Sequence, residues 1–152
     1  ISLADIGCGY GALYKFILRD NKYKQILYSG YDLNRQMISY CKEKYPNSNH
    51  FFQGSKPIKI VDYCIFVGTF NLCYSNNYMF WKRYIFDSLI NNWKFCNKGI
   101  ILNITSKKVG NIENNIFYSD NNFKKDLERE FGKVKCNESS LLKNNTTYLI
   151  NK

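Results

Sequence analysis

A run of closely spaced glycines near the start of the sequence has the residue types and spacing of a ligand-binding turn. It reads Asp5-Ile6-Gly7-Cys8-Gly9-Tyr10-Gly11, which is a G-x-G-x-G spacing with an acid two positions before the first glycine. A glycine-rich turn between a strand and a helix leaves the backbone bare, so a ligand can lie against its N–H groups. The dinucleotide fingerprint spaces its glycines as G-x-G-x-x-G, which this run does not match.

Two carboxylates belong to the same candidate site. Asp32 ends a second apolar segment, where an acid can accept hydrogen bonds from both hydroxyls of a ribose. Asp5 stands at the glycine-rich turn, where a cationic amino-acid end could be held. Ligands of open α/β sheets bind beyond the carboxyl ends of the strands, so we expect the ligand at this edge.

The segment after the fourth apolar run faces the same edge. It reads Gly68-Thr69-Phe70-Asn71, and we expect Thr69, Phe70 and Asn71, together with Tyr10, to shape a substrate pocket. Tyr74 and Tyr118 are expected to form further pocket walls. His50 is the only histidine and stands at the start of the third strand, at the opposite edge of the sheet from the site, so no side chain is assigned as catalytic.

The cysteines do not indicate a metal site. Six are present, and none of them forms a C-x-x-C pair, whereas a zinc site needs four closely spaced Cys or His ligands. We therefore expect no metal and no disulfide framework, and we interpret most of the cysteines as small buried apolar residues.

The apolar pattern predicts strands that alternate with helices. Strands are expected at residues 2–6, 26–31, 50–52, 60–67, 100–104, 134–136 and 148–150. Helices are expected at 12–19, from an N-cap at Asn34 to just before Pro46, at 78–93, and from a cap at Asp120 or Asn121 to 131. Gly99 is expected to mark the turn into the fifth strand, and Gly132 to close the last helix.

This alternation predicts an α/β three-layer sandwich around a mostly parallel seven-stranded sheet. The last two strands are joined by about ten residues without a helix. A short connection requires antiparallel neighbours, so the final strand should run against the others.

These features together resemble the class I methyltransferases that use S-adenosylmethionine. The run from Asp5 to Gly11 is similar to the first motif of that family, and Tyr31-Asp32-Leu33-Asn34, followed by Met37 and Ile38, is similar to the second. The resemblance extends over essentially the whole chain. It implies methyl transfer from S-adenosylmethionine to an acceptor that the sequence does not identify, and we expect that acceptor to be a small molecule.

The resemblance also implies roles for single residues. The glycines line the methionine and ribose portions of the cofactor, Asp32 binds the ribose hydroxyls, and Leu33 lies against the adenine. Family members often carry a Gly-Asp pair after the third strand; the pair here is Gly54-Ser55, so Gln53 or Ser55 is expected to replace the acid. The cofactor-binding residues expected are Asp5, Gly7, Cys8, Gly9, Gly11, Asp32, Leu33, Gln53, Gly54, Ser55 and Gly68.

Other functions remain open at this stage. The net charge is +10, although the lysines are scattered, so an RNA-binding or RNA-modifying module with a basic surface is one alternative. A cofactor-binding fold without activity is another. A nicotinamide-dependent oxidoreductase is disfavoured by the glycine spacing and the length. Methyl transfer needs alignment of donor and acceptor rather than a dedicated base, so it is compatible with a distant His50.

The length indicates a single domain. A chain of 152 residues can bury one core, and we expect one methyltransferase domain over residues 1–152. The sequence starts within the first core strand and without methionine, so we expect it to lack the family's N-terminal covering segment. No apolar run approaches the ~20 residues of a membrane span, and no basic leader is present, so the expected compartment is the cytoplasm.

Overall fold

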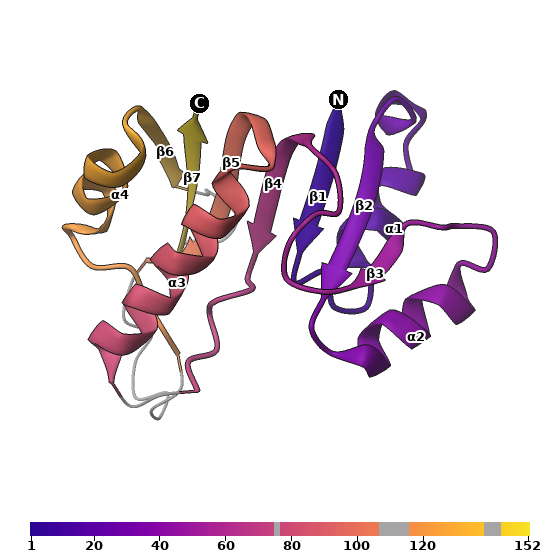
Figure 1. The fold of residues 1–152 in the computed structure, drawn as a ribbon, viewed down its shortest axis with the longest axis horizontal. Coiled ribbons are helices and arrows are strands. Elements are labelled where there is room, and N and C mark those ends of the chain that lie inside the picture. The colour runs from indigo at the N-terminus through magenta and orange to yellow at the C-terminus, as the bar shows by residue number, and fades with distance from the viewer. Residues whose placement is uncertain (75–76, 107–115, 139–143) are drawn as a thin grey trace.

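Seven strands form one mostly parallel sheet in the order β3-β2-β1-β4-β5-β7-β6 (Figure 1). The computed structural model describes residues 1–74, 77–106, 116–138 and 144–152. The strands are β1 Ser2–Ile6, β2 Leu27–Asp32, β3 Phe51–Gln53, β4 Val61–Val67, β5 Cys96–Thr105, β6 Val134–Glu138 and β7 Asn145–Asn151. Strand β7 pairs antiparallel with both of its neighbours, as expected for the final strand.

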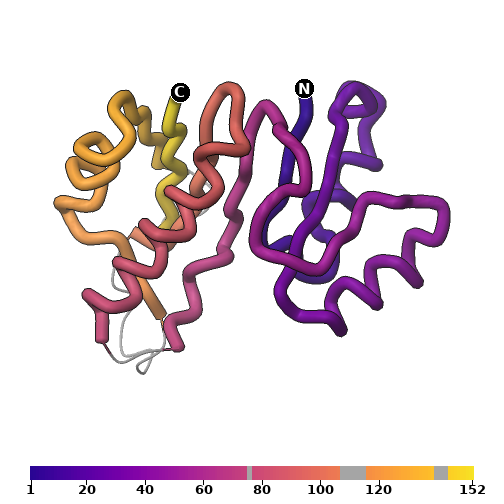
Figure 2. The backbone as a smooth tube through the Cα atoms, in the orientation of Figure 1, coloured from indigo at the N-terminus to yellow at the C-terminus, as the bar shows by residue number. Residues whose placement is uncertain are grey.

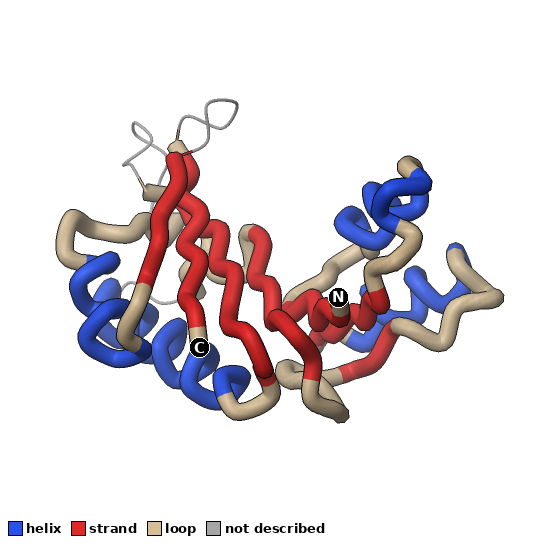
Figure 3. Tube along the Cα trace, turned by 90° about the horizontal axis from the view of Figure 1, so that it is seen from above, coloured by secondary structure: helices blue, strands red, loops and turns tan. Residues whose placement is uncertain are grey.

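Helices cover the two faces of this sheet. They are α1 Ala12–Leu18, the 3-10 helix η1 Asn21–Tyr23, α2 Arg35–Lys44, α3 Tyr78–Trp93 and α4 Phe123–Phe131. Helices α1 and α2 bury Ile17, Ile38 and Cys41 against Tyr28 and Phe51. Helices α3 and α4 cover the other face, as the view along the sheet shows (Figure 3). The predicted α/β sandwich is therefore confirmed.

Helix α3 has the bounds expected from its apolar spacing. Trp81, Ile85 and Leu89 recur every four residues and all three are buried against the sheet. Burial of each such side chain contributes roughly 1.5–3 kcal/mol to folding. The N-cap expected for α2 is also present, since the Asn34 side chain accepts a hydrogen bond from the Gln36 N–H.

Two expected boundaries are wrong. Strand β5 begins at Cys96, so Gly99 lies inside the strand and not in a turn before it. Helix α4 has Asn122 as its N-cap, where Asp120 or Asn121 was expected. The Asp120 carboxylate stabilises the turn that leads into α4, because it accepts a hydrogen bond from the Asn122 N–H at 2.9 Å.

The connection from β3 to β4 contains no helix. Residues 54–60, all of which the structure describes, cross from one side of β2 and β1 to the other without regular structure. A connection between parallel strands of one sheet normally packs a helix onto a face. This connection therefore provides no helix to cover the part of the sheet face that lies beside α3.

Both chain termini lie at the top of the view in Figure 2, whereas the arrows of the parallel strands in Figure 1 point to the opposite edge. Among the described residues, no helix is both long and apolar enough to cross a membrane. The same residues contain no group of three or more His, Cys, Asp or Glu side chains that could hold a metal ion. Five of the six cysteines are buried, as expected for small apolar residues, and Cys136 is exposed.

Gly99 generates a stability prediction. Its φ is +145°, and a Cβ at this position would overlap the Ile150 carbonyl of β7, which is backbone and has no freedom to move away. We expect Gly99→Ala to lower the free energy of unfolding by roughly 2–4 kcal/mol, measured by urea denaturation.

Gly132→Ala is the matched control for that measurement. Gly132 also has a positive φ, +90°, but nothing lies within 4 Å of the place that a Cβ would take, so only the backbone conformation is penalised. Its ψ is −119°, outside the left-handed helical region, so its cost should be about 1–3 kcal/mol, the penalty of a conformation that favours glycine, and clearly smaller than that of Gly99→Ala. Equal losses for the two variants would contradict the assigned clash.

Candidate functional site

The Asp32 carboxylate joins the glycine-rich turn to the end of β2. Its Oδ2 atom accepts a hydrogen bond from the Gly9 N–H at 2.9 Å, and its Oδ1 atom accepts one from the Asn34 N–H at 2.8 Å. An ionised carboxylate has about four acceptor positions, so lone pairs remain for hydroxyl groups of a ligand. Gly9 and Asp32 thus lie at one rim of the sheet, as the sequence predicted.

The turn itself is fastened to strands on both sides. The N–H groups of Gly7 and Cys8 donate to the Tyr31 carbonyl at 2.7 and 3.0 Å. The Thr69 hydroxyl, which follows β4, donates to the Ile6 carbonyl at 2.7 Å. Gly7 has φ +77°, and a Cβ there would stand 2.5 Å from the Thr69 methyl, so only glycine allows this approach. These hydrogen bonds hold the ends of β1, β2 and β4 close to one another.

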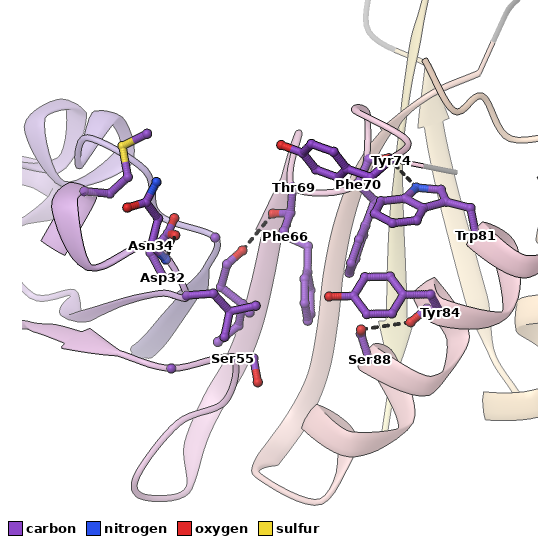
Figure 4. A pocket seen from close by; sticks show the side chains of 15 residues that line it. Asp32, Asn34, Ser55, Phe66, Thr69, Phe70, Tyr74, Trp81, Tyr84 and Ser88 are labelled. Carbon is purple, nitrogen blue, oxygen red and sulfur yellow. Dashed lines mark hydrogen bonds between the residues drawn. The ribbon is translucent and has the colours of Figure 1, made fainter. Parts of the chain in front are cut away.

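A cavity of about 510 Å³ opens beside this turn (Figure 4). That volume is within the range of roughly 300–1,000 Å³ typical of small-molecule sites. The residues that line it are Ile6, Gly7, Asp32, Leu33, Asn34, Met37, Gly54, Ser55, Phe66, Thr69, Phe70, Tyr74, Trp81, Tyr84 and Ser88.

Many of the residues predicted from the sequence line this cavity. They are Gly7, Asp32, Leu33, Gly54, Ser55, Thr69, Phe70 and Tyr74. Gly9 adjoins it through its bond to Asp32, and nothing lies within 4 Å of the position that a Gly9 Cβ would occupy. A bare backbone, a carboxylate and apolar walls therefore meet in one place.

Asp5 lies on the opposite face of the sheet, away from the cavity lining. Its carboxylate is only 3% exposed and accepts a hydrogen bond from the Tyr28 hydroxyl at 2.8 Å. Burial raises the pKa of Asp5 to about 6, opposed by the Tyr28 hydrogen bond and assisted by the negative charge of Asp32. Burial, with the Asp5 charge added, also raises the pKa values of Tyr28 and of the Cys8 thiol above their ordinary range.

Four other predicted residues stabilise the site's surroundings. The Asn71 side-chain oxygen accepts from the Thr105 N–H at 3.1 Å and so ties the loop after β4 to the end of β5. The Gln53 amide donates to the Leu33 carbonyl at 3.4 Å. Gly68 takes φ +69° in the loop after β4, and Gly11 takes φ +73° as the N-cap of α1.

Three aromatic or basic candidates lie elsewhere. Tyr10 is 58% exposed and packs edge-on against Tyr40 at 5.0 Å between ring centroids. Tyr118 lies against Tyr78. His50 is exposed beside Tyr14, on the α1 side of the sheet. None of the three is among the lining residues of the cavity.

The sequence reasoning missed the wall that α3 contributes. Trp81, Tyr84 and Ser88 stand at i, i+3 and i+7 of this helix, a spacing that places them on one face. The spacing was visible in the sequence. Its role was not evident there, because aromatic residues at helical spacing are equally typical of a face that packs into the core.

An adenosyl group fits the residues that are present. A diol can be received by the remaining lone pairs of Asp32, and a purine by the apolar Leu33 and Met37 beside Gly54. The bare turn at Gly7 and Gly9 admits a chain that extends from the sugar. Apart from Gly9, which is bonded to Asp32, all of these residues line the same cavity.

Comparison with known proteins supports the fold. No protein-family model matches the sequence, and no curated protein sequence matches it. Solved structures do match. Magnesium protoporphyrin IX methyltransferase (ChlM) from Synechocystis PCC 6803, with bound SAH, has a TM-score of 0.66 at 14% identity, over 97% of this chain and 71% of that one.

Two further structures have the same arrangement. TrmK of M. capricolum, in complex with S-adenosyl-homocysteine, has a TM-score of 0.59 at 14% identity, over 99% of this chain and 62% of its own. PigF with SAH has a TM-score of 0.69 at 13% identity, over 99% of this chain and 50% of that one. The chain spans only 48% of the CurJ carbon methyltransferase, about half of that protein. The chain thus has the class I methyltransferase fold.

Asp5 generates a prediction on pH and stability. Its pKa is higher in the fold than the ordinary 3.8, so the folded state binds the extra proton and stability falls as pH rises from about 4 to about 6. Asn at this position has no such penalty and can still accept from Tyr28. We expect the stability of Asp5→Asn, relative to the unchanged chain, to rise by roughly 2 kcal/mol between pH 4 and 7.

Urea denaturation of both proteins across that pH range is the measurement. A buried amide without full partners can add a constant offset, so the change of the difference with pH is the informative quantity. Parallel stability curves for the two proteins would show that Asp5 titrates normally.

Proposed function

We propose that this chain binds S-adenosylmethionine at the Asp32 rim and transfers its methyl group to a small-molecule acceptor. The observation that carries the proposal is the pairing of Asp32 with the Gly9 turn at the mouth of a cavity of about 510 Å³. The class I methyltransferase fold of the chain and the bound SAH named for ChlM, TrmK and PigF support it.

Residues of this chain would bind and orient the two reactants. Asp32 receives the ribose hydroxyls and, since Gly9 and Asn34 already hold both carboxylate oxygens, it loses little freedom on binding. Leu33 is 62% exposed, so contact with a planar base would bury apolar surface at this residue. The Thr69 hydroxyl is engaged by Ile6, so it positions the turn and takes no proton.

The chemistry requires alignment above all. When bound, the sulfonium supplies an activated methyl group. The methyl group would pass to a lone pair of the acceptor while the electron pair of the carbon–sulfur bond stays on sulfur, and a proton carried by the acceptor would leave to water. Such an in-line displacement depends on holding the reacting atoms close together, which a preorganised turn provides.

Removal of the Asp32 carboxylate tests the proposal. We expect Asp32→Ala to weaken the binding of S-adenosylhomocysteine by about 1–3 kcal/mol, because two ribose hydroxyls lose a charged acceptor. Isothermal titration calorimetry gives the affinities. Unchanged affinity, or no binding to the unchanged chain, would contradict the proposed site.

Two controls accompany this variant. Asp20→Ala removes the carboxylate that caps η1, which is paired with Lys22 on the surface, and should leave binding unchanged. Asp32→Asn keeps an oxygen for the Gly9 or Asn34 N–H, so it separates loss of the turn from loss of the ligand contact. Denaturation of each variant shows whether the fold persists.

A further inference from the structure

The cavity has two chemically different ends (Figure 4). The polar end comprises Asp32, Asn34 and Ser55, from β2, the start of α2 and the loop after β3. The aromatic end comprises Phe66, Phe70, Tyr74, Trp81, Tyr84 and Ser88, from β4, the loop that follows it and α3. The two ends face each other across Thr69.

The aromatic end exists because of how the β3–β4 connection is anchored. The Asn92 side chain, near the end of α3, donates to the Ser55 carbonyl at 3.0 Å and to the Ser88 carbonyl at 2.9 Å. Asn92 is only 2% exposed, so this anchor is fixed. The loop is therefore held at the last turns of α3, and the preceding turns at Tyr84 and Ser88 face the cavity.

The rings of the aromatic end are held in place before any ligand arrives. The Trp81 indole N–H donates to the Phe70 carbonyl at 3.0 Å. Phe66 stacks on Phe70 with 5.3 Å between centroids, and Trp81 stacks on Tyr84 at 4.9 Å. Preorganised rings lose little entropy when they bind a further flat group, and stacked aromatic pairs are favourable beyond their buried area.

The exposure of these rings increases towards the mouth. Phe66 and Phe70 are buried, whereas Tyr84 is 40% and Tyr74 is 87% exposed. The Tyr84 hydroxyl points into the cavity, while the Ser88 hydroxyl donates to the Tyr84 carbonyl at 2.8 Å. A ligand here would meet ring faces and one hydroxyl, and among the described lining residues no charged side chain belongs to this end.

We propose that the aromatic end binds the methyl acceptor, and that this acceptor is a flat, uncharged aromatic molecule with one polar substituent that pairs with the Tyr84 hydroxyl. The proposal rests on the proposed function, because it requires the polar end to be taken by the cofactor. It deepens that function by assigning a substrate class. The missing β3–β4 helix is then the feature that makes room for the substrate.

Calorimetry with 2-naphthol as the probe tests this assignment. The unchanged chain should bind 2-naphthol equally well, within about threefold, with and without saturating S-adenosylhomocysteine. Ser88→Phe places a ring in the aromatic end and should lower 2-naphthol affinity at least tenfold more than it lowers S-adenosylhomocysteine affinity. Asn91→Phe, which introduces the same ring at an exposed position of the same helix, should leave both affinities unchanged.

A second variant covers the case that Ser88→Phe does not fold. Tyr84→Phe removes only the hydroxyl and keeps the stacked ring, so 2-naphthol affinity should fall about three- to tenfold and naphthalene affinity should stay the same.

The outcomes separate the two proposals. If S-adenosylhomocysteine binds and 2-naphthol does not, the aromatic end is not an acceptor site and the proposed function stands. Competition between the two ligands would assign the aromatic end to the cofactor and overturn the inference. If S-adenosylhomocysteine fails to bind the unchanged chain, both proposals fail.

Discussion

The arrangement of the site depends on one carboxylate that accepts two backbone N–H groups. Asp32 holds Gly9 with one oxygen and Asn34 with the other, so a single side chain fixes the glycine-rich turn, the end of β2 and the start of α2. Charge-assisted hydrogen bonds of this kind are shorter and stronger than neutral ones. The same side chain is the group best placed to meet a ligand, and local stability and binding therefore rely on the same atoms.

Gly7 and Thr69 position the glycine-rich turn that the Asp32 carboxylate holds. Gly7 lets Thr69 approach from β4, and the Thr69 hydroxyl satisfies the Ile6 carbonyl, which lies at the end of β1. The ends of β1 and β4 thus meet through the Thr69 side chain, because Gly7 has no side chain of its own to keep it away. Asp5 adds a negative charge beneath the turn, kept apart from solvent by Tyr28.

Much of the fold followed from local patterns. The period of the apolar residues predicted α3 to its bounds, and the lack of a helix before the last strand predicted its reversed direction. The prediction of a turn at Gly99 was wrong because glycine is equally typical of turns and of strand positions that a neighbouring backbone approaches closely. Only the pairing with β7 distinguishes these two environments. The rim of the site was predictable because Asp32 and the glycines are adjacent to strand ends. The α3 wall was not, because it depends on where Asn92 anchors a loop 37 residues away in sequence.

The central position of β1 has a consequence for how the protein is made. Strand β1 pairs with β4, and the Ser2 N–H donates to Asp62, a partner 60 residues further along the chain. Pairings over such separations cost more loop-closure entropy than local ones and are associated with slower folding. During translation the glycine-rich segment leaves the ribosome before β4, yet it cannot adopt its shape until β4 has followed. A motif that is synthesised early thus acquires its paired conformation only after the segment that contains β4 has been synthesised.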